Sequence, residues 1–219
     1  MLRQSLESPG DGIYVQQLVI TFRESLDPER LLSAWDTILA RHAILRTSFR
    51  VSLTGDIVQD VGSPVAVPVR QEDWSRQNCQ ESGRRLKDYL NDDRRRGFEV
   101  DQAPLWRLGL FHCGELDWRC VWTSHHALLD GRSRRRLLLE WLGLYDALSE
   151  GIEPVCELPP PPFTDYARWL TTQDPARSRS FFEALLQGFA EPTPLPMARR
   201  TPDRTGGMPR HGALDWFLD

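Results

Sequence analysis

The sequence predicts an α/β layer structure, an α+β sandwich in which helices flank a mixed β-sheet. Segments rich in β-branched and apolar residues alternate with segments whose apolar residues recur at helical spacing. Two predicted strands, residues 105–111 and 118–126, are separated by a short turn at residues 113–115 and form the best hairpin candidate. This order of strand, helix, strand, helix, hairpin and helices is typical of such a layered fold.

The first part of the chain contains a predicted strand at residues 14–22. Asp27 and Pro28 then supply a helix N-cap and a proline at the first helical position, and apolar residues follow at helical spacing. Strand character returns at residues 45–51, and residues 55–73 carry glycines and prolines around short β-prone pieces. We therefore expect strand, helix and strand in this order.

The remaining helices are predicted from apolar spacing and from their stop signals. The helix at residues 80–96 carries many arginines, which are expected to form a solvated face, and Gly97 is its expected stop. A strongly apolar helix follows at residues 133–148, and two more are predicted at residues 163–170 and 176–187. Beyond them, a proline-, glycine- and arginine-rich stretch resembles a linker, and a short strand is expected near the end of the chain.

Composition is that of a soluble globular protein. Of the 219 residues, 40% are hydrophobic and 26% are charged, and the formal net charge of −4 argues against nucleic-acid binding. No apolar run is long enough to cross a bilayer, and the N-terminus lacks the core of a signal peptide, so a cytoplasmic location is expected. The cysteines form no CxxC pair and are expected to be free thiols. They are Cys79, Cys113, Cys120 and Cys156.

The concentrated chemical signal is SHHALLDG at residues 124–131. Because side chains alternate across a strand, His125 and His126 should point to opposite faces, so only one imidazole can enter a given pocket. An imidazole at a strand end, with an ordinary pKa of about 6.5, suits proton transfer at neutral pH. Asp130 can cap the following helix. Gly131 can let the backbone pass through a tight space or can adopt a positive φ.

Other interpretations of this segment compete with proton transfer. The two histidines could be one core residue and one surface residue without chemistry. A metal site made of His125, His126 and Asp130 is disfavoured, because the histidines diverge and no third close ligand is evident. A serine hydrolase is disfavoured, because Ser124 lacks the G-x-S-x-G context of a nucleophile elbow.

Three stretches occur in order along the chain, RHAILRTSF at residues 41–49, SHHALLDGRS at residues 124–133 and FTDYARW at residues 163–169, and together they resemble the motifs of condensation domains of nonribosomal peptide synthetases. Residues 124–133, SHHALLDGRS, resemble the HHxxxDG signature, and residues 41–49, RHAILRTSF, resemble the upstream RHExLRTxF motif. Residues 163–169, FTDYARW, resemble the downstream YxDYAxW motif, and residues 98–110 resemble the segment before the catalytic strand. The resemblance covers nearly the whole chain.

The resemblance implies a lobe of the chloramphenicol-acetyltransferase-like fold and an amide-forming acyl transfer. In that reaction the amine of a carrier-bound acceptor attacks a carrier-bound donor thioester. His126 is the implied catalytic residue, and Asp130 is expected to pair with Arg46. The residues implied to support the site are His125, Asp130, Gly131 and Arg46.

The resemblance also implies the domain organisation. Residues 1–190 are expected to form the N-terminal lobe of a condensation domain, and residues 191–219 a linker and first strand leading toward a C-terminal lobe.

The chain departs from the family pattern at Ala43, where an acidic residue is usual, and at Arg132, where an aromatic or aliphatic residue is frequent. The basic run at residues 132–136 is expected to be a solvated helix face, with attraction to a phosphate or an acidic carrier surface as the alternative.

The implied partners are peptidyl and aminoacyl carrier proteins, the C-terminal lobe and adjacent synthetase modules, with no nucleic acid and no membrane. No metal or cofactor is expected to bind the domain itself, because the acyl groups arrive on the phosphopantetheine of the carriers. One alternative is an acyltransferase of the same superfamily that uses coenzyme A or an alcohol. Another is a non-catalytic module that binds carrier proteins, and a lobe by itself is expected to be inactive.

Overall fold

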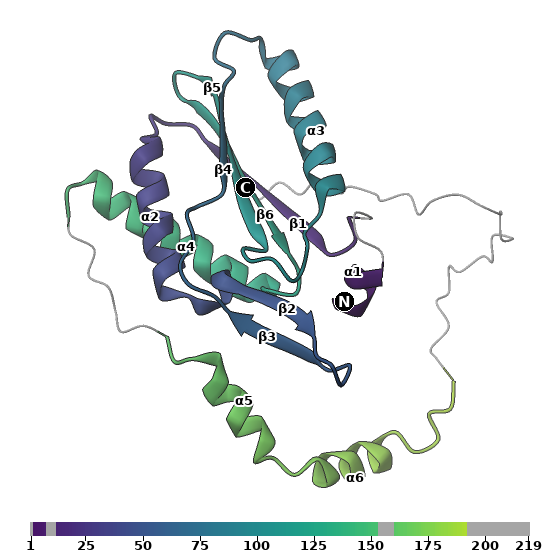
Figure 1. The fold of residues 1–219 in the computed structure, drawn as a ribbon. Helices are drawn as coiled ribbons and strands as arrows, with labels where there is room; N and C mark the ends of the chain where they lie inside the picture. Colours follow the sequence, from purple (N-terminus) through teal and green to yellow (C-terminus); the bar gives the residue numbers. More distant parts are fainter. Residues whose placement is uncertain (1, 8–11, 153–159, 192–219) are drawn as a thin grey trace, which may run out of the picture. The chain divides into compact units, whose positions relative to one another are not determined.

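The fold is that of a mixed α/β protein (Figure 1). The computed structural model describes residues 2–7, 12–152 and 160–191. The chain divides into two compact units, Met1–Asp165 and Tyr166–Asp219. The elements of the first unit are α1 (Leu2–Glu7), β1 (Val15–Phe22), α2 (Pro28–Arg41), the 3₁₀ turn η1 (Ala43–Arg46), β2 (Thr47–Val51), β3 (Ile57–Val61), β4 (Val69–Asp73), α3 (Cys79–Arg96), β5 (Trp106–Gly114), β6 (Asp117–His125) and α4 (Gly131–Ser149). Helix α5 (Phe163–Thr171) lies at the boundary, and α6 (Pro175–Leu185) belongs to the second unit.

The main sheet has the strand order β1-β6-β5-β4. Strands β1 and β5 both pair antiparallel with β6, whereas β4 pairs parallel with β5, so the sheet is mixed as the sequence predicts. The predicted hairpin is β5–β6, with Leu110 opposite Cys120. Strands β2 and β3 form a separate antiparallel pair.

Helices cover both faces of this sheet, α2 and α4 on one side and α3 on the other (Figure 1). The core under α2 and α4 is centred on Trp35, whose ring lies 4.6 Å from that of Trp141, 4.9 Å from that of Trp122 and 5.2 Å from that of Trp106. Each aromatic contact of this kind adds about 0.5–1.5 kcal/mol beyond the burial of apolar area. The smaller cluster under α3 consists of Trp74, Phe111 and Val121.

Local sequence signals explain where the helices begin and end. The Asp27 carboxylate accepts hydrogen bonds from the backbone N–H groups of Glu29 and Arg30, and Pro28 is the first helical residue of α2. Helix α3 ends at Gly97, which has a φ of 60°, a conformation that glycine adopts without strain. These caps confirm the signals in the sequence.

The structure corrects the strand predicted at residues 45–51. Residues Ala43–Arg46 form the turn η1, closed by a hydrogen bond from Leu45 N–H to His42 C=O, and strand β2 begins only at Thr47. Leu45 of the turn is buried in the core, and the Trp106 indole donates to its carbonyl. A tertiary contact therefore shortens the strand.

The C-terminal predictions have mixed outcomes. Helices α5 and α6 occupy the segments predicted for them, and residues 160–191 are all exposed. The predicted strand near the end of the chain lies outside the described residues, so the division into a lobe and a linker at residue 190 stays a prediction. Among the helices that the structure describes, none combines the length and apolar character that a membrane crossing requires.

Candidate active site

The SHHALLDG motif lies at the C-terminal end of strand β6, at one end of the sheet. Its side chains alternate as predicted, since Cys120 and Trp122 belong to the core under α2 and α4 while Val121 belongs to the cluster under α3. The strand ends at His125, one residue earlier than predicted, so His126 is the first residue after it. His125 is therefore the last residue of the strand, and His126 belongs to the loop that follows.

The backbone of the motif loop orients the His126 ring. Its Nδ1 atom lies 2.9 Å from the carbonyl oxygen of Leu129, and its own backbone N–H donates to the Tyr14 carbonyl at 2.8 Å. A carbonyl oxygen can only accept, so Nδ1 carries a proton and the neutral ring keeps its lone pair on Nε2. Among the described residues Nε2 has no hydrogen-bond partner, and the side chain is partly exposed. His126 therefore presents a proton-accepting nitrogen to the surroundings.

His125 has the opposite arrangement. Its ring is 2% exposed, Nδ1 accepts from the Ala127 backbone N–H at 3.1 Å, and Nε2 lies 3.0 Å from the Ser5 hydroxyl. Because Nδ1 accepts, the neutral ring carries its proton on Nε2. Burial lowers the pKa of His125, and the nearby His126 ring lowers it further. A buried ring with both nitrogens engaged fits a supporting role.

Asp130 caps the helix that follows the motif. Its carboxylate accepts from the Ser133 backbone N–H at 2.7 Å, and this bond holds the pKa of Asp130 below its usual value. Helix α4 consequently begins at Gly131, two residues earlier than predicted. The capping role considered from the sequence is therefore present.

The expected pairing of Asp130 with Arg46 is not formed among the described residues. Arg46 instead donates to two backbone carbonyls, to that of Leu39 at 3.3 Å and to that of Gly62 at 2.9 Å. The guanidinium thereby holds the end of α2 against the segment after β3. Carbonyl groups close to it in the chain satisfy its donors in place of a carboxylate 84 positions away.

Gly131 has neither of the backbone features expected of it. It is not among the glycines with positive φ, and a Cβ atom added to it would meet nothing within 4 Å. A side chain at this position would instead enter open space at the start of α4. The structure therefore gives no steric reason within the described chain for a glycine here.

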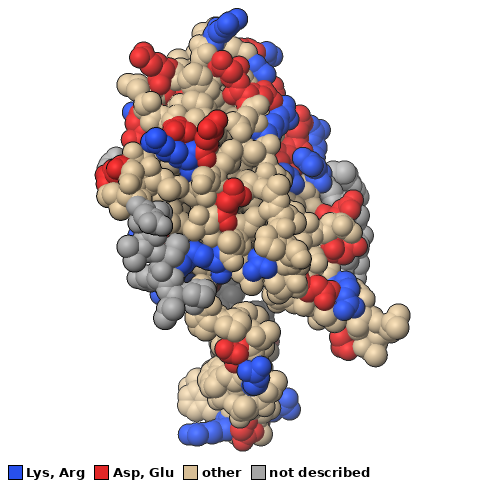
Figure 2. All heavy atoms as spheres, turned by 60° about the vertical axis from the view of Figure 1, so that its left-hand side comes forward, with Lys and Arg blue, Asp and Glu red and all other residues tan. Residues whose placement is uncertain are grey.

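The basic run at the start of α4 divides into two kinds of residue. Arg132, Arg135 and Arg136 are exposed, as a solvated face requires. Arg134 is half-buried and donates to the Gln16 side chain at 3.1 Å, and burial lowers its pKa. Over the face shown in Figure 2, acidic and basic side chains are interspersed.

The alternative chemistries gain no support from the geometry. Within the described residues no group of histidine, cysteine and carboxylate side chains could hold a metal ion. The Ser124 hydroxyl is buried in the strand and has no hydrogen-bond partner within the described part of the chain, which is the wrong setting for a nucleophile. Of the motif side chains, that of His126 is partly exposed and has a ring nitrogen without a hydrogen-bond partner among the described residues.

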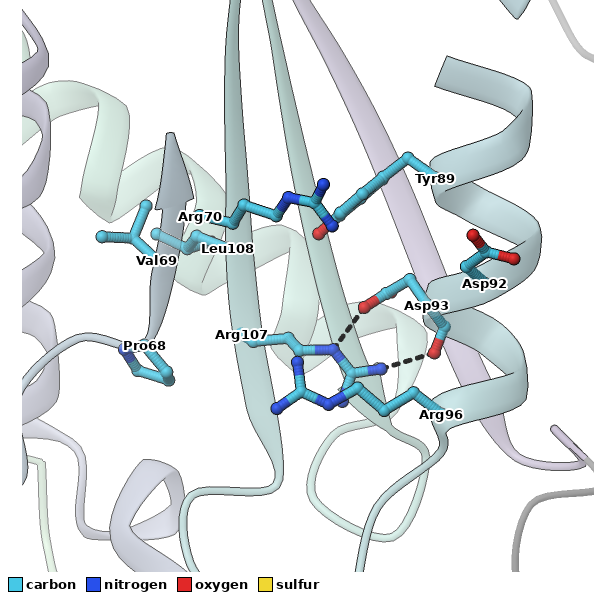
Figure 3. A pocket seen from close by; sticks show the side chains of 9 residues that line it. All are labelled: Pro68, Val69, Arg70, Tyr89, Asp92, Asp93, Arg96, Arg107 and Leu108. Atoms are coloured by element: carbon cyan, nitrogen blue, oxygen red, sulfur yellow. Dashed lines mark hydrogen bonds and ion pairs between the residues drawn. The ribbon is translucent and has the colours of Figure 1, made fainter. Parts of the chain in front are cut away.

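A pocket lies on the α3 side of the sheet, and no motif residue lines it (Figure 3). Its inner wall carries the buried ion pair between Arg107 and Asp93. The lining residues are Pro68, Val69, Arg70, Tyr89, Asp92, Asp93, Arg96, Arg107 and Leu108. His126 therefore lies outside the lining of this pocket.

Several contacts around the motif and the upstream segment were not predicted from the sequence. Tyr14 has a φ of 67°, a left-handed conformation unusual for a tyrosine, and its carbonyl accepts the His126 N–H. Arg41 and His42 of the upstream motif both reach Glu140 of α4, at 2.8 Å each. In the sequence, Arg41 and His42 are visible only as two adjacent basic residues, and Tyr14 only as part of a β-prone segment. Neither feature indicates which residue is the partner.

Comparison with known proteins identifies the family. The condensation-domain family model matches residues 1–208. The chain is 40% identical over 199 residues to a linear gramicidin synthase of Brevibacillus parabrevis, a match that covers 91% of this chain and 4% of that protein. It is 33% identical over 197 residues to chondramide synthase of Chondromyces crocatus, covering 88% of this chain and 5% of that protein.

Solved structures share the fold. The starter condensation domain of rhizomide synthetase superposes with a TM-score of 0.76 at 18% identity, covering 87% of this chain and 46% of that one. The first condensation domain of the calcium-dependent antibiotic synthetase gives 0.71 at 19% identity, covering 88% and 46%. The chain thus spans less than half the length of these structures and a small part of its curated relatives. With motif, fold and family model in agreement, the chain belongs to the condensation-domain family.

Proposed function

We propose that this chain is the histidine-bearing part of a condensation domain that forms amide bonds in nonribosomal peptide synthesis. The observation that carries the proposal is the His126 ring, whose Nδ1–H is held by the Leu129 carbonyl while Nε2 is left without a partner among the described residues. Membership of the condensation-domain family and the relatives among peptide synthases support the choice of reaction.

The chemistry assigned to His126 is proton transfer. The acceptor amine attacks the donor thioester carbon, the C–N bond forms and the C–S bond breaks. The proton lost by the amine passes to His126 Nε2 and then to the departing thiolate. A positioned general base of this kind contributes about 10²–10⁴-fold to a rate, and alignment of two tethered substrates can contribute as much or more.

The neighbouring residues are proposed to keep this ring in place. His125 anchors the loop through the Ala127 N–H, and Asp130 starts helix α4 immediately after Leu129. Gly131 leaves open space at the helix start, where a substrate could approach the motif. Arg46 contributes at a distance by holding the end of α2.

The proposed partners are carrier proteins that bring both acyl groups on phosphopantetheine, the C-terminal lobe of the same domain, and adjacent synthetase modules. Two findings support them: the relatives are peptide synthases, and this chain covers only 46% of each of the two matched condensation-domain structures. No cofactor of the domain's own is part of the proposal.

The test is carrier-bound product formation by the complete domain that contains this chain, followed by intact mass. A donor acyl-carrier and an acceptor aminoacyl-carrier should give one amide product that remains on the acceptor carrier. Product formed only when coenzyme A thioesters or free alcohols are supplied would favour the related acyltransferases. No product from a folded domain, across several loaded carriers, would favour a binding role without catalysis.

A further inference from the structure

One buried carboxylate on α3 is bonded to three neighbouring strands of the sheet. Asp93 is 6% exposed, and its Oδ2 atom accepts from the Thr123 hydroxyl at 2.6 Å and from the Gln17 amide at 2.9 Å. Its Oδ1 atom pairs with Nε of Arg107, whose guanidinium also donates to the Asp93 carbonyl at 2.6 Å and to the Gly97 carbonyl at 2.8 Å. Figure 3 shows this pair at the inner wall of the α3 pocket.

The three donors form a single row across the sheet. Gln17 of β1 lies opposite Thr123 of β6, and Thr123 lies opposite Arg107 of β5. Because these residues are direct cross-strand partners, their side chains stand on the same face, the one covered by α3. A single carboxylate therefore fixes the register of β6 relative to both neighbouring strands, β1 and β5.

This row lies next to the motif. Thr123 is two residues before His125 on the same face of β6, and the next pair along that face is Val15 with His125. Immediately beyond it the His126 N–H donates to the Tyr14 carbonyl. Any slip of β6 against β1 at the row would move that hydrogen bond and the ring that follows it.

Stability alone is a poor explanation for such a group. Replacing a buried ion pair by apolar residues of similar volume is often neutral or stabilising. What a carboxylate that accepts three hydrogen bonds provides is a fixed geometry, since each bond tolerates only a narrow range of distance and angle. Register is strongly specified where one face of a sheet is buried, because a slip of one residue moves every side chain of the strand to the other face.

We propose that Asp93, acting through Thr123, is a positioning residue for His126. The carboxylate holds the end of β6 in the register in which the His126 N–H donates to the Tyr14 carbonyl. In this register Nε2 of His126 faces the substrate. The catalytic part of this inference rests on the proposed function, whereas the placement of the loop can be measured without it.

Thr123→Val is the decisive change, with Thr123→Ser as its conservative partner. Valine keeps the shape and the strand preference of the fully buried Thr123, and removes one hydroxyl. Asp93 then still pairs with Arg107 and Gln17, so no charge is left alone. Asp92→Asn is the matched control, because Asp92 is the adjacent residue on α3, is exposed and pairs only with Arg95 in the described structure.

The first readout is amide hydrogen exchange in this chain. Thr123→Val should raise the exchange rates of the His125 and His126 amides about tenfold while the thermal unfolding midpoint stays within a few degrees of the parent. Thr123→Ser and Asp92→Asn should leave both rates unchanged. Equal rates in the valine variant and the parent would overturn the inference.

The second readout is turnover in the complete domain. Thr123→Val should lower kcat about tenfold with little change in KM, because misplacement of a proton-transfer group acts on the chemical step. A kcat within twofold of the parent, despite faster amide exchange, would overturn the catalytic part of the inference. If the parent itself forms no amide product, the proposed function fails, and the exchange rates still decide the placement.

Discussion

His126 is oriented by Leu129, three residues further along the same loop, through an Nδ1–H donated to the Leu129 carbonyl at 2.9 Å. The loop therefore sets the tautomer of its own histidine, and Nε2 is left with the lone pair. The next residue, Asp130, caps helix α4, so the orientation of the ring is coupled to the start of that helix. The adjacent His125 has the other tautomer, so the two neighbouring rings carry their lone pairs on different nitrogens.

Removing the cap of α4 should destabilise the fold. In Asp130→Ala the Ser133 N–H loses its acceptor, and we expect the midpoint of thermal unfolding to fall by a few degrees. Asp130→Asn keeps an oxygen acceptor and should lie close to the parent. Equal midpoints for the alanine variant and the parent, measured by circular dichroism, would contradict the capping role.

The cap should also make stability depend on pH at the acid end. Because the folded pKa of Asp130 lies below its ordinary value of 3.8, its contribution is complete above that value. The contribution is lost as the pH falls through the lowered pKa. Denaturant unfolding at a series of pH values should therefore show the parent and Asp130→Ala converging at the acid end, whereas a constant difference would contradict this account.

His125 should give a second pH dependence with a different window. Its folded pKa is lowered from the ordinary value of 6.5, so the unfolded chain binds the proton more readily. The free energy of unfolding should fall as the pH drops from 6.5 toward the lowered pKa, and should level off below it. His125→Gln should lack this component. Parallel pH profiles for the two proteins, from denaturant titrations, would be inconsistent with the buried neutral ring.

Much of the fold was predictable because its signals are local. The alternation along β6, the Asp27 cap and the Gly97 stop each depend on a few consecutive residues, and all three are present in the structure. The motif could likewise be located from eight consecutive residues. These features and the position of the histidine pair therefore needed no tertiary information, whereas the start of β2 at Thr47 did.

The partners of the motif were not predictable because they depend on distant contacts. Asp93 lies in the charged run NDDRRR, where nothing in the sequence distinguishes it from the exposed Asp92 beside it. It is buried only because α3 packs on the sheet. Arg46 was assigned to Asp130 by resemblance, yet its donors are satisfied by carbonyls seven and sixteen residues away. The left-handed conformation of Tyr14 likewise has no signature in the residue type itself.

Gly109 should not tolerate a side chain. A Cβ atom there would lie 2.7 Å from the Tyr89 hydroxyl and 3.0 Å from the Phe111 ring, so Gly109→Ala should destabilise the protein by about 1–3 kcal/mol. Gly143 of α4 is the matched control, because nothing lies within 4 Å of its added Cβ. Gly143→Ala should stabilise the helix by about 0.5–1 kcal/mol. Denaturant unfolding measures both changes. An unaltered free energy of unfolding for Gly109→Ala would contradict the close contact between Tyr89 and the backbone at Gly109.

The central claim is that His126 performs the proton transfer, and its most direct test is the rate of amide formation by the complete domain and its His126→Ala variant. The control is His112→Ala, a histidine of β5 that pairs with Asp73 and stacks on Trp118, away from the motif. We predict that His126→Ala lowers the rate by about 10²–10⁴-fold with the unfolding midpoint preserved, whereas His112→Ala leaves the rate nearly unchanged. A His126→Ala domain that forms product within threefold of the parent rate would contradict the account.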